Sequence, residues 1–472
     1  MVSVFLFHSD LRLQDNTGLN AALASGVPVL PVFIFTPEQI TPSKNSYFSG
    51  PAVKFMCESL EDLDGQLRSK STSLSCFQGD TIAVLNEIHK ITKVISVYCN
   101  RDESVYATAR DSKITSWCAQ HNIQFHSFED VGLTQMDEAR LEGGRPYSVL
   151  SQYYKRVLKD VVVRAPKTQR GKFVATFQNS KFKINITDLE SFYDKSKYEN
   201  VATGGRREGV KGLAALKDRL DYAKQRDLPA NVRGTTRMSA HLRFGTISIR
   251  EMYWELVKLY GKDNAIIREL VFRDFYRKIY TWRPELQRGV AFQTALDQRI
   301  SWSHGSSPSW HAWTTATSGI PLVDAGMREL FAMGWCHNRV RMVIASVATR
   351  HMRLDWRDCA QFFYRHLVDA DTFSNTAGWQ WAAGVGVDSA PYFRPPFNPF
   401  RQSYKFDKNA VYIKRWIPEL ENVATNDIHK WGDSKVRAKY PGVSYPAPVI
   451  DVIQASKEST NMYKHIVQIL KK

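Results

Sequence analysis

Two tryptophans follow two carboxylates and an asparagine in the stretch DADTFSNTAGWQWAAG. The residues concerned are Asp369, Asp371, Asn375, Trp379 and Trp381. A core segment would not carry the carboxylates, and a solvated loop would not carry the indoles. The asparagine amide can both donate and accept hydrogen bonds. The combination is therefore typical of a polar site with aromatic walls.

A second group lies on one predicted helix face between residues 335 and 352. Asn338 lies three residues after Trp335, and Arg341 and Met342 lie three and four residues after Asn338, so we expect all four on one side of that helix. An aliphatic stripe at this spacing would indicate core packing. An indole, an amide, a guanidinium and a thioether are costly to bury without partners, which favours a cavity wall.

A third group is Glu269, Phe272 and Arg273 in the stretch RELVFRDFYRK. Their spacing predicts one shared helix face. A carboxylate beside an aromatic ring could belong to a binding site. It could equally form an ordinary surface ion pair with Arg273, and the spacing does not decide between these readings.

A fourth group places hydroxyls and a guanidinium where a helix is predicted to begin, in the stretch TTRMSAHLRFG. Its members are Thr235, Thr236, Arg237 and Ser239. The free N–H groups of a helix N-terminus bind phosphate, and these side chains add donors. Simple helix capping by the same hydroxyls is the alternative.

The elements that would position these groups fall into two parts. Short Val-, Ile- and Phe-rich runs alternate with helical patterns early in the chain, which predicts a parallel sheet covered by helices on both faces. No G-x-G-x-x-G follows the first run, so a dinucleotide fingerprint is not supported. The predicted strands are 2–8, 27–35, 73–78, 93–99 and 123–128.

A polar and basic stretch follows, and after it the helical period dominates. We predict an α/β domain over residues 1–130, a linker over 131–209 and an all-α domain over 210–472.

The composition narrows the class of protein further. The net charge of +17 over 472 residues favours a polyanion partner, and nucleic acid is the common one. No apolar run is long enough to span a bilayer, so no membrane association is expected.

Six scattered cysteines without C-x-x-C argue against a zinc or iron–sulfur site, and we expect no metal. No targeting leader is recognised, so we expect the cytoplasm, or the nucleus if the source is eukaryotic.

Six motifs in order resemble the photolyase/cryptochrome family, most closely the class I cyclobutane pyrimidine dimer photolyases. The resemblance covers nearly the whole chain. The motifs are FHSDLRLQDNTGL, TTRMSAHLRFGTIS, GWCHNRVRM, LDWRDC, DADTFSNTAGWQWAAGVGVDSAPYFRPPFNP and KFDKNAVYIKRWIPEL.

The resemblance implies a fold and an activity. The fold would be a Rossmann-like α/β antenna domain, a long linker and a helical FAD-binding catalytic domain in a monomer. The activity would be light-driven repair of cyclobutane pyrimidine dimers in DNA, by electron transfer from reduced FAD to the flipped-out dimer. The alternative is a cryptochrome-type blue-light receptor that binds FAD and has little or no repair activity. An aminoacyl-tRNA synthetase of class I is disfavoured because its HIGH and KMSKS signatures are absent.

The resemblance also assigns catalytic roles. Glu269 would hydrogen-bond a carbonyl of the dimer, and Asn375 would face flavin N5. Trp379, Trp356 and Trp302 would carry an electron to the flavin.

The remaining contacts follow from the matching motif positions. Phosphates of FAD would be held by Tyr222, Thr235, Thr236, Arg237 and Ser239. The flavin would be lined by Trp335, Asn338, Arg341, Asp369 and Asp371, with Arg341 paired to Asp369. The dimer would be contacted by Glu269, Phe272, Asn338, Met342 and Trp381. Backbone phosphates of DNA would be held by Arg226, Arg273, Arg339 and Arg394.

Three positions bear on the subclass. Relatives that repair the (6-4) photoproduct carry histidines where this chain has Asn338 and Met342, which favours the cyclobutane dimer as substrate. Phe272 stands where class I enzymes usually have a lesion-stacking tryptophan, a departure that favours weaker DNA affinity or a receptor. The stretch CNRDESVYATARD lies where the family binds a second chromophore, and it distinguishes neither a folate nor a deazaflavin.

Overall fold

The computed structural model describes residues 1–175, 177, 180–389 and 395–471. The described chain forms two compact units. Unit 1 comprises Met1–Leu220, Thr236–Pro284 and Val368–Asp371, and unit 2 comprises Asp221–Thr235, Glu285–Leu367 and Thr372–Lys472. The predicted boundaries at residues 130 and 209 stay a prediction. Arg394, one of the predicted phosphate contacts, lies outside the described residues.

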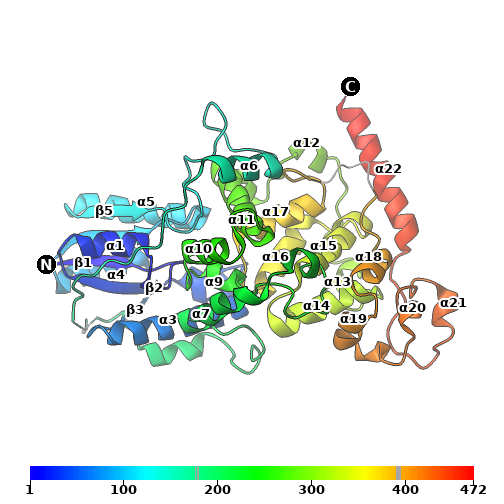
Figure 1. Ribbon diagram of the computed structural model, residues 1–472, viewed down its shortest axis with the longest axis horizontal. Coiled ribbons are helices and arrows are strands. Elements are labelled where there is room, and N and C mark those ends of the chain that lie inside the picture. Colours follow the sequence, from blue (N-terminus) through cyan, green and yellow to red (C-terminus); the bar gives the residue numbers. More distant parts are fainter. Residues whose placement is uncertain (176, 178–179, 390–394, 472) are drawn as a thin grey trace. The chain divides into compact units, whose positions relative to one another are not determined.

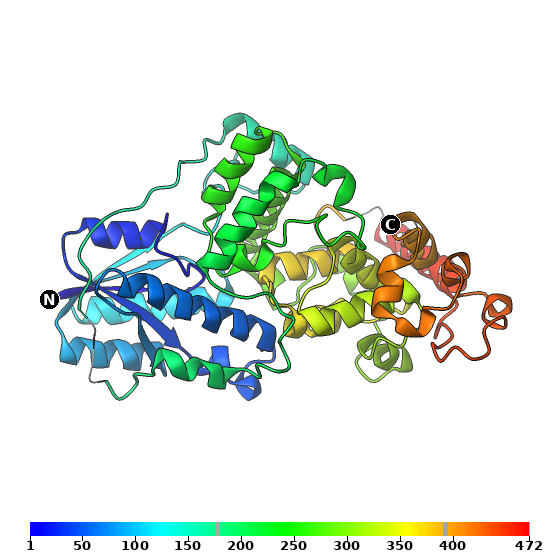
Figure 2. The same cartoon turned by 60° about the horizontal axis from the view of Figure 1, so that its bottom comes forward.

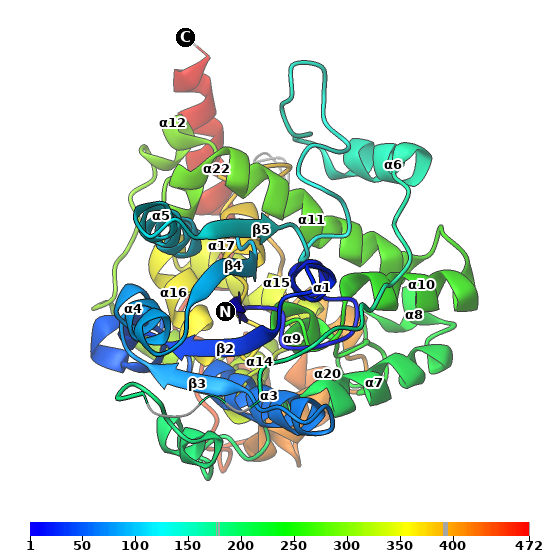
Figure 3. The ribbon, with the colours of Figure 1, turned by 90° about the vertical axis from the view of Figure 1, so that its left-hand side faces the viewer.

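Unit 1 contains one five-stranded sheet, and all of its strand pairs are parallel. The strand order is β3-β2-β1-β4-β5, with the chain's first strand in the middle (Figure 3). This order confirms the predicted parallel α/β architecture. The strands are β1 (Val2–Leu6), β2 (Val29–Phe35), β3 (Ser75–Gln78), β4 (Val94–Asn100) and β5 (Gln124–Phe128).

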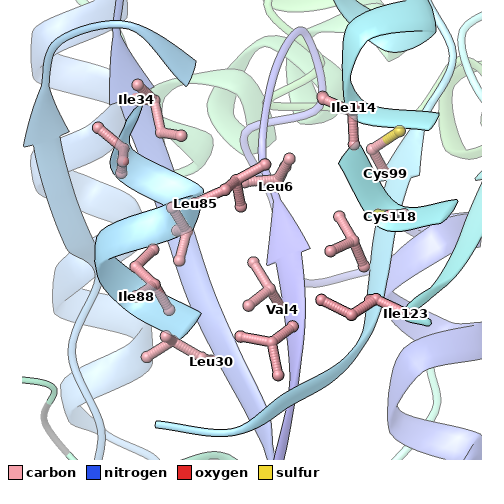
Figure 4. Packing of buried hydrophobic residues seen from close by; sticks show 14 of the residues in the cluster. Val4, Leu6, Leu30, Ile34, Leu85, Ile88, Cys99, Ile114, Cys118 and Ile123 are labelled. Carbon is pink, nitrogen blue, oxygen red and sulfur yellow. The ribbon is translucent and has the colours of Figure 1, made fainter. Parts of the chain in front are cut away.

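Helices cover both faces of this sheet, α4 and α5 on one side and α1 and α3 on the other (Figure 3). Alternation along β1 turns Val4 and Leu6 toward the α4/α5 side, where they pack with Leu85, Ile88 and Ile114 (Figure 4). Ser3 and Phe5, which alternate with Val4 and Leu6 along the strand, face the α1/α3 side. The helix bounds are α1 (Thr17–Ala24), α2 (Pro37–Ile40), α3 (Gly50–Arg68), α4 (Thr81–Ile91) and α5 (Val105–Gln120).

Unit 1 also contains helices from later in the chain. Among them α10 and α11 lie side by side (Figure 2). Ser248 caps α10 in a capping box with Glu251, and Asn264 caps α11 through two main-chain N–H groups. The bounds are α6 (Leu150–Asp160), α7 (Arg206–Ala214), α9 (Ser239–Arg243), α10 (Ile249–Tyr260) and α11 (Ala265–Trp282).

Unit 2 is helical, as predicted, and ends in the long helix α22 (Figure 1). A π-helical segment, Val347–His351, directly follows α15. The helices are α8 (Tyr222–Gln225), α12 (Thr294–Asp297), α13 (Pro308–Thr314), α14 (Pro321–Met333), α15 (Asn338–Ser346), α16 (Trp356–His366), α17 (Thr372–Ala382), α18 (Pro399–Phe406), α19 (Val411–Trp416), α20 (Thr425–Ile428), α21 (Ser434–Arg437) and α22 (Val452–Leu470).

The prediction of a helix starting at Trp335 was wrong. The preceding helix α14 ends at Met333 and is capped by Gly334, which adopts the left-handed conformation, and α15 begins only at Asn338. The side chain of His337 caps α15 by accepting the N–H of Arg339 at 3.2 Å. Trp335 therefore lies on a short connection, and helical spacing does not place it on the face of Asn338.

A buried ionic network joins the sheet to α10 within unit 1. Asp130 contacts the guanidinium groups of Arg12 and Arg250, each at 2.6 Å. Asp15 contacts Arg250 at 2.7 Å and Arg164 at 2.5 Å. Burial by itself would raise the pKa of Asp130, but Arg12 and Arg250 hold that pKa well below its usual range.

We predict that Asp130→Asn lowers the free energy of unfolding by about 3–5 kcal/mol, because it leaves two buried guanidinium groups short of a counter-charge. The measurement is urea unfolding of purified protein. The exposed Asp137→Asn serves as the control and should change stability by at most about 0.5 kcal/mol.

The difference in unfolding free energy between wild type and Asp130→Asn should depend on pH. The folded-state pKa of Asp130 lies below the unfolded value of about 3.9, so its stabilisation is complete above that pH and is lost as the pH falls further. The gap between wild type and Asp130→Asn should stay constant from about pH 7 to pH 5 and shrink below about pH 4. Equal stabilities at pH 7 would contradict the role given to the network.

Candidate functional site

Helix α11 carries the Glu269 group. Because Asn264 caps the helix just before Ala265, the three- and four-residue spacing does put Glu269, Phe272 and Arg273 on one face. Glu269 and Phe272 are partly exposed. The ring of Phe272 is supported by Tyr276 at a centroid distance of 4.8 Å.

Arg273 does not form the surface ion pair that the sequence left open. Its guanidinium donates to the main-chain carbonyls of Val131 at 2.9 Å and Leu242 at 3.4 Å. Among the described residues no ion pair joins it to Glu269. The carboxyl of Glu269 and the ring of Phe272 therefore stand beside an arginine that is held by the backbone.

The hydroxyl-rich turn before α9 is not a conventional helix cap. Met238 occupies the N-cap position of α9 and makes no side-chain cap bond. Ser239 is the first helical residue and is exposed, and Arg237 adopts a left-handed backbone conformation with φ of 56°. Thr236 accepts the N–H of Met238 at 3.4 Å, ahead of the helix. Hydroxyl and guanidinium donors are thus gathered at this turn, as a phosphate group would require.

Arg243, at the end of α9, brings distant motifs together within unit 1. It donates to the hydroxyl of Ser9 at 2.7 Å and to the carbonyl of Ala370 at 2.8 Å. Ala370 separates Asp369 from Asp371, so both predicted flavin contacts are held near α9. Sequence analysis missed Arg243, because nothing in local spacing links it to residues more than one hundred positions away.

A close approach of two chain segments reinforces this arrangement. The N–H of Leu11 donates to the carbonyl of Phe244 at 3.0 Å. At the next residue, Gly245, φ is 63° and a Cβ atom would lie 2.3 Å from the carbonyl oxygen of Ser9. Only glycine fits this position.

In unit 2, predicted flavin and dimer contacts lie on the connection before α15 and on the first turns of that helix. Asn338 is exposed, and Trp335, Arg341 and Met342 are partly exposed. The amide of Asn338 contacts the sulfur of Met342 at 3.9 Å, as expected four residues apart on a helix. The guanidinium of Arg341 donates to the carbonyl of Cys336 at 2.7 Å and lies 5.8 Å from the ring centre of Trp335.

Two of the predicted phosphate-binding arginines already have partners in unit 2. Arg339 binds both carboxylate oxygens of Asp227, at 2.9 and 3.2 Å, and stacks on Phe406 at 4.6 Å. The guanidinium of Arg226 lies 5.4 Å from the ring centre of Tyr222. A DNA phosphate at Arg339 would therefore compete with Asp227, a residue that the sequence reading missed.

Helix α17 turns its two tryptophans toward different neighbours. Trp379 is 4% exposed and packs on Phe363 at a centroid distance of 5.0 Å. Trp381 is partly exposed. The amide nitrogen of Asn375 donates to the carbonyl of Ala360 at 2.9 Å, which fixes the orientation of that amide.

The other two tryptophans of the predicted electron chain share one acceptor. The indole N–H groups of Trp302 and Trp356 both donate to Oδ1 of Asp297, at 3.0 and 3.1 Å. Arg357 binds Oδ2 of the same carboxylate. The sequence reading missed Asp297, because an acidic residue in a polar stretch carries no periodic signal of burial.

A small hollow in unit 1 lies where β1 and β2 end. Its polar lining includes His8, Thr36, Gln39, Tyr106 and Arg110, and the last two belong to the stretch assigned to a second chromophore. The hydroxyls of Thr36 and Tyr106 are 2.7 Å apart. Burial, together with Arg110, holds the pKa of His8 well below its usual value, so this imidazole is neutral.

The chemistry of the predicted cofactor contacts fits FAD. Hydroxyls and a guanidinium suit a diphosphate, and an indole with amide and guanidinium donors suits a flavin ring. Unit 1 carries Thr236, Arg237, Ser239, Asp369 and Asp371, whereas unit 2 carries Tyr222, Thr235, Trp335, Asn338, Arg341 and Asn375.

Within the described ranges, no helix combines the length and apolarity that crossing a membrane requires.

Comparison with known proteins confirms the resemblance read from the motifs. The chain matches the family described as DNA photolyase over residues 3–170, and the FAD binding domain of DNA photolyase over residues 266–465. The deoxyribodipyrimidine photo-lyase of Alkalihalophilus pseudofirmus is 31% identical, over 97% of this chain and 97% of that protein.

Two solved structures are similar over nearly their whole length. An archaeal photolyase from Sulfolobus tokodaii, crystallised with two FAD molecules, is 35% identical with a TM-score of 0.87, covering 98% of this chain and 100% of that one. A class III photolyase from Agrobacterium tumefaciens is 29% identical with a TM-score of 0.87, covering 99% and 98%. Fold, motifs and full-length similarity agree, and the chain belongs to the DNA photolyase family.

Proposed function

We propose that this protein repairs cyclobutane pyrimidine dimers in DNA, using light and bound FAD. The observation that carries the proposal is the partly exposed face of α11, where Glu269 and Phe272 lie beside an Arg273 that is held by two main-chain carbonyls. Full-length similarity to a deoxyribodipyrimidine photo-lyase supports the same reaction. Reduced FAD, when bound, supplies the electron that splits the dimer.

Residues of α11 and α15 would recognise the dimer. A dimer must leave the base stack to be reached, and an aromatic face such as Phe272 stabilises an extruded base by stacking. In its protonated form Glu269 would donate a hydrogen bond to a dimer carbonyl and stabilise the charge that develops there. Asn338, which is exposed, and Met342, which is partly exposed and in contact with it, would touch the dimer together with Trp381 and favour it over the (6-4) photoproduct.

Asn375 would select the reduced state of the cofactor. Its amide nitrogen is engaged by the carbonyl of Ala360, so the amide oxygen is the atom left to face a partner. An acceptor at that position favours a protonated flavin N5. Trp335, Arg341, Asp369 and Asp371 would line the ring in the roles that the family resemblance implies.

Charged and hydroxyl groups would hold phosphates of two kinds. Thr235, Thr236, Arg237 and Ser239, with Tyr222, would bind the diphosphate of FAD. Arg226, Arg273, Arg339 and Arg394 would bind DNA phosphates, Arg339 by exchanging its bond to Asp227 for a phosphate. We further propose that the protein acts as a monomer, in the cytoplasm or in a eukaryotic nucleus.

Repair of a defined lesion tests the proposed reaction directly. Photoreduced protein mixed with an oligonucleotide carrying one thymine dimer should restore thymine absorbance under blue light and not in the dark. Glu269→Ala should lower the yield per absorbed photon by about tenfold, because one preorganised donor to the developing charge is lost. Lack of repair by protein that holds reduced FAD would contradict the proposal of a repair enzyme and favour a cryptochrome-type receptor.

Binding to damaged DNA tests the stacking role of Phe272. Phe272→Ala should weaken binding to dimer-containing DNA by about tenfold, since stacking of a base on an aromatic ring contributes about 1–3 kcal/mol. Phe272→Trp should tighten binding about threefold through its larger ring. Fluorescence anisotropy at fixed salt measures both, and Trp282→Ala, an exposed ring of the same helix, is the control. Identical affinities for all four proteins would show that Phe272 does not meet the lesion.

We also propose that the surface around the hollow of unit 1 binds a second, light-harvesting chromophore, a folate, a deazaflavin or a second flavin. The two FAD molecules of the Sulfolobus tokodaii photolyase support this idea. The half-exposed Tyr106 and the guanidinium of Arg110 would contact the planar ring.

Tyr106→Ala should therefore lower the content of second chromophore several-fold while leaving the FAD content unchanged. Absorption spectra of purified protein after denaturation measure both contents. Tyr47→Ala, equally exposed elsewhere, is the matched control. A chromophore content that Tyr106→Ala does not change would place the chromophore at another site.

A further inference from the structure

The carboxylate of Asp297 links the two outer tryptophans of the predicted electron chain. It is 5% exposed, and Oδ1 accepts the indole N–H groups of both Trp302 and Trp356. Trp356 is 1% exposed, whereas Trp302 is partly exposed. One carboxylate oxygen thus touches a buried indole and an indole that reaches solvent.

The backbone fixes these two indoles relative to each other. The N–H of Ser303 donates to the carbonyl of Arg353 at 2.7 Å, and the N–H of Asp355 donates to the carbonyl of Ser303 at 2.9 Å. Trp302 and Trp356 are the residues next to this bridge. The shared hydrogen bonds to Asp297 are therefore built into the fold and do not depend on a mobile side chain.

Within the described chain, Arg357 contacts the indole of Trp356 but not that of Trp302. Its guanidinium binds Oδ2 of Asp297 and lies 4.4 Å from the ring centre of Trp356. No such cation contact with Trp302 occurs among the described residues. A neighbouring cation disfavours positive charge on a ring, while the carboxylate favours it on both rings. Arg357 and Asp297 together therefore favour oxidation of Trp302 over oxidation of Trp356.

We propose that Asp297 is the proton acceptor shared by this pair, and that Arg357 biases the oxidised indole toward Trp302. The proposal rests on the proposed function, in which the chain delivers an electron to FAD. Trp302 gives one electron to oxidised Trp356, and its Nε1 proton passes to Oδ1 of Asp297. The products are a neutral indolyl radical and a neutral carboxylic acid. An external thiol later supplies one electron, and Asp297 returns the proton.

The geometry suits this transfer. A proton acceptor must lie within hydrogen-bond reach of the proton it takes, and the distance from Trp302 Nε1 to Asp297 Oδ1 is 3.0 Å. Positive charge on the indole favours loss of its N–H proton to a neighbouring anion. Asp297 is thus a positioning residue before oxidation and an internal base afterwards.

The test follows tryptophanyl radicals by transient absorption after a blue flash on protein holding oxidised FAD. In wild type, formation of the neutral radical should not depend on buffer concentration, because the acceptor is internal. In Asp297→Asn it should slow by about 100-fold and accelerate with added buffer. Asp358→Asn, a carboxylate in the first turn of the same helix as Trp356, is the matched control and should behave as wild type.

The wild-type measurement decides the matter even if Asp297→Asn does not fold. Radical formation that accelerates with buffer in wild type would overturn the proposal, because the proton would then go to solvent. Dimer repair by prereduced wild type tests the proposed function separately. Repair without buffer-independent radical formation would reject only the role of Asp297.

The bias attributed to Arg357 has its own readout. In Arg357→Gln, more of the radical should reside on buried Trp356, so quenching by added ferrocyanide should become slower, about threefold. Arg299→Gln removes an exposed guanidinium three residues before Trp302 in the chain, which donates to the carbonyl of Ala295, and it should leave quenching unchanged. Equal quenching in wild type and Arg357→Gln would refute the bias.

Discussion

Asp15 and Asp130 lie buried between the guanidinium groups of Arg12 and Arg250, and this contact decides how unit 1 is built. Burying a charge is costly unless it is paired and fully hydrogen-bonded, so each of the four groups requires the others. Arg12 follows β1, Asp130 follows β5, and Arg250 is the second residue of α10. The carboxyl-terminal edge of the sheet is thereby tied to a helix more than one hundred residues away.

The rest of unit 1 depends on that attachment. Two further buried contacts extend it along α11, where Arg277 binds Glu103 at 2.7 Å and Asp274 accepts the N–H of Thr134 at 2.7 Å. With α10 and α11 held against the loops that follow the strands, α9 is also held, and Arg243 can reach both Ser9 and Ala370. The position of Glu269 and Phe272 is thus a consequence of salt bridges remote from them.

Unit 2 uses polar contacts differently. Its tryptophans are not merely packed in a core, because the indole N–H groups of Trp302 and Trp356 bond one buried carboxylate whose other oxygen binds an arginine. Trp379 instead packs on aromatic rings. Because the indoles of the chain have different electrostatic surroundings, the energy of placing a positive charge differs from one indole to the next. This difference gives electron transfer a direction.

The sequence by itself determined the elements and the family. Period-two and period-3.6 patterns are local properties, so all five strands, their parallel arrangement and the helical second unit could be predicted, as could the shared face of Glu269 and Phe272. Six motifs in order identified the family. The left-handed Gly334 ended a helix before Trp335, a local event that the apolar pattern did not reveal.

Only the tertiary structure decided which polar groups meet. Arg273 bonds two carbonyls and not Glu269, Arg339 bonds Asp227, and Asp297 joins two indoles that are 54 positions apart in sequence. Hydrogen bonds and ion pairs between distant segments depend on how the elements pack, and residue spacing carries no record of them. Chemistry-bearing residues could therefore be named from the sequence, whereas the partners that set their charge and orientation could not.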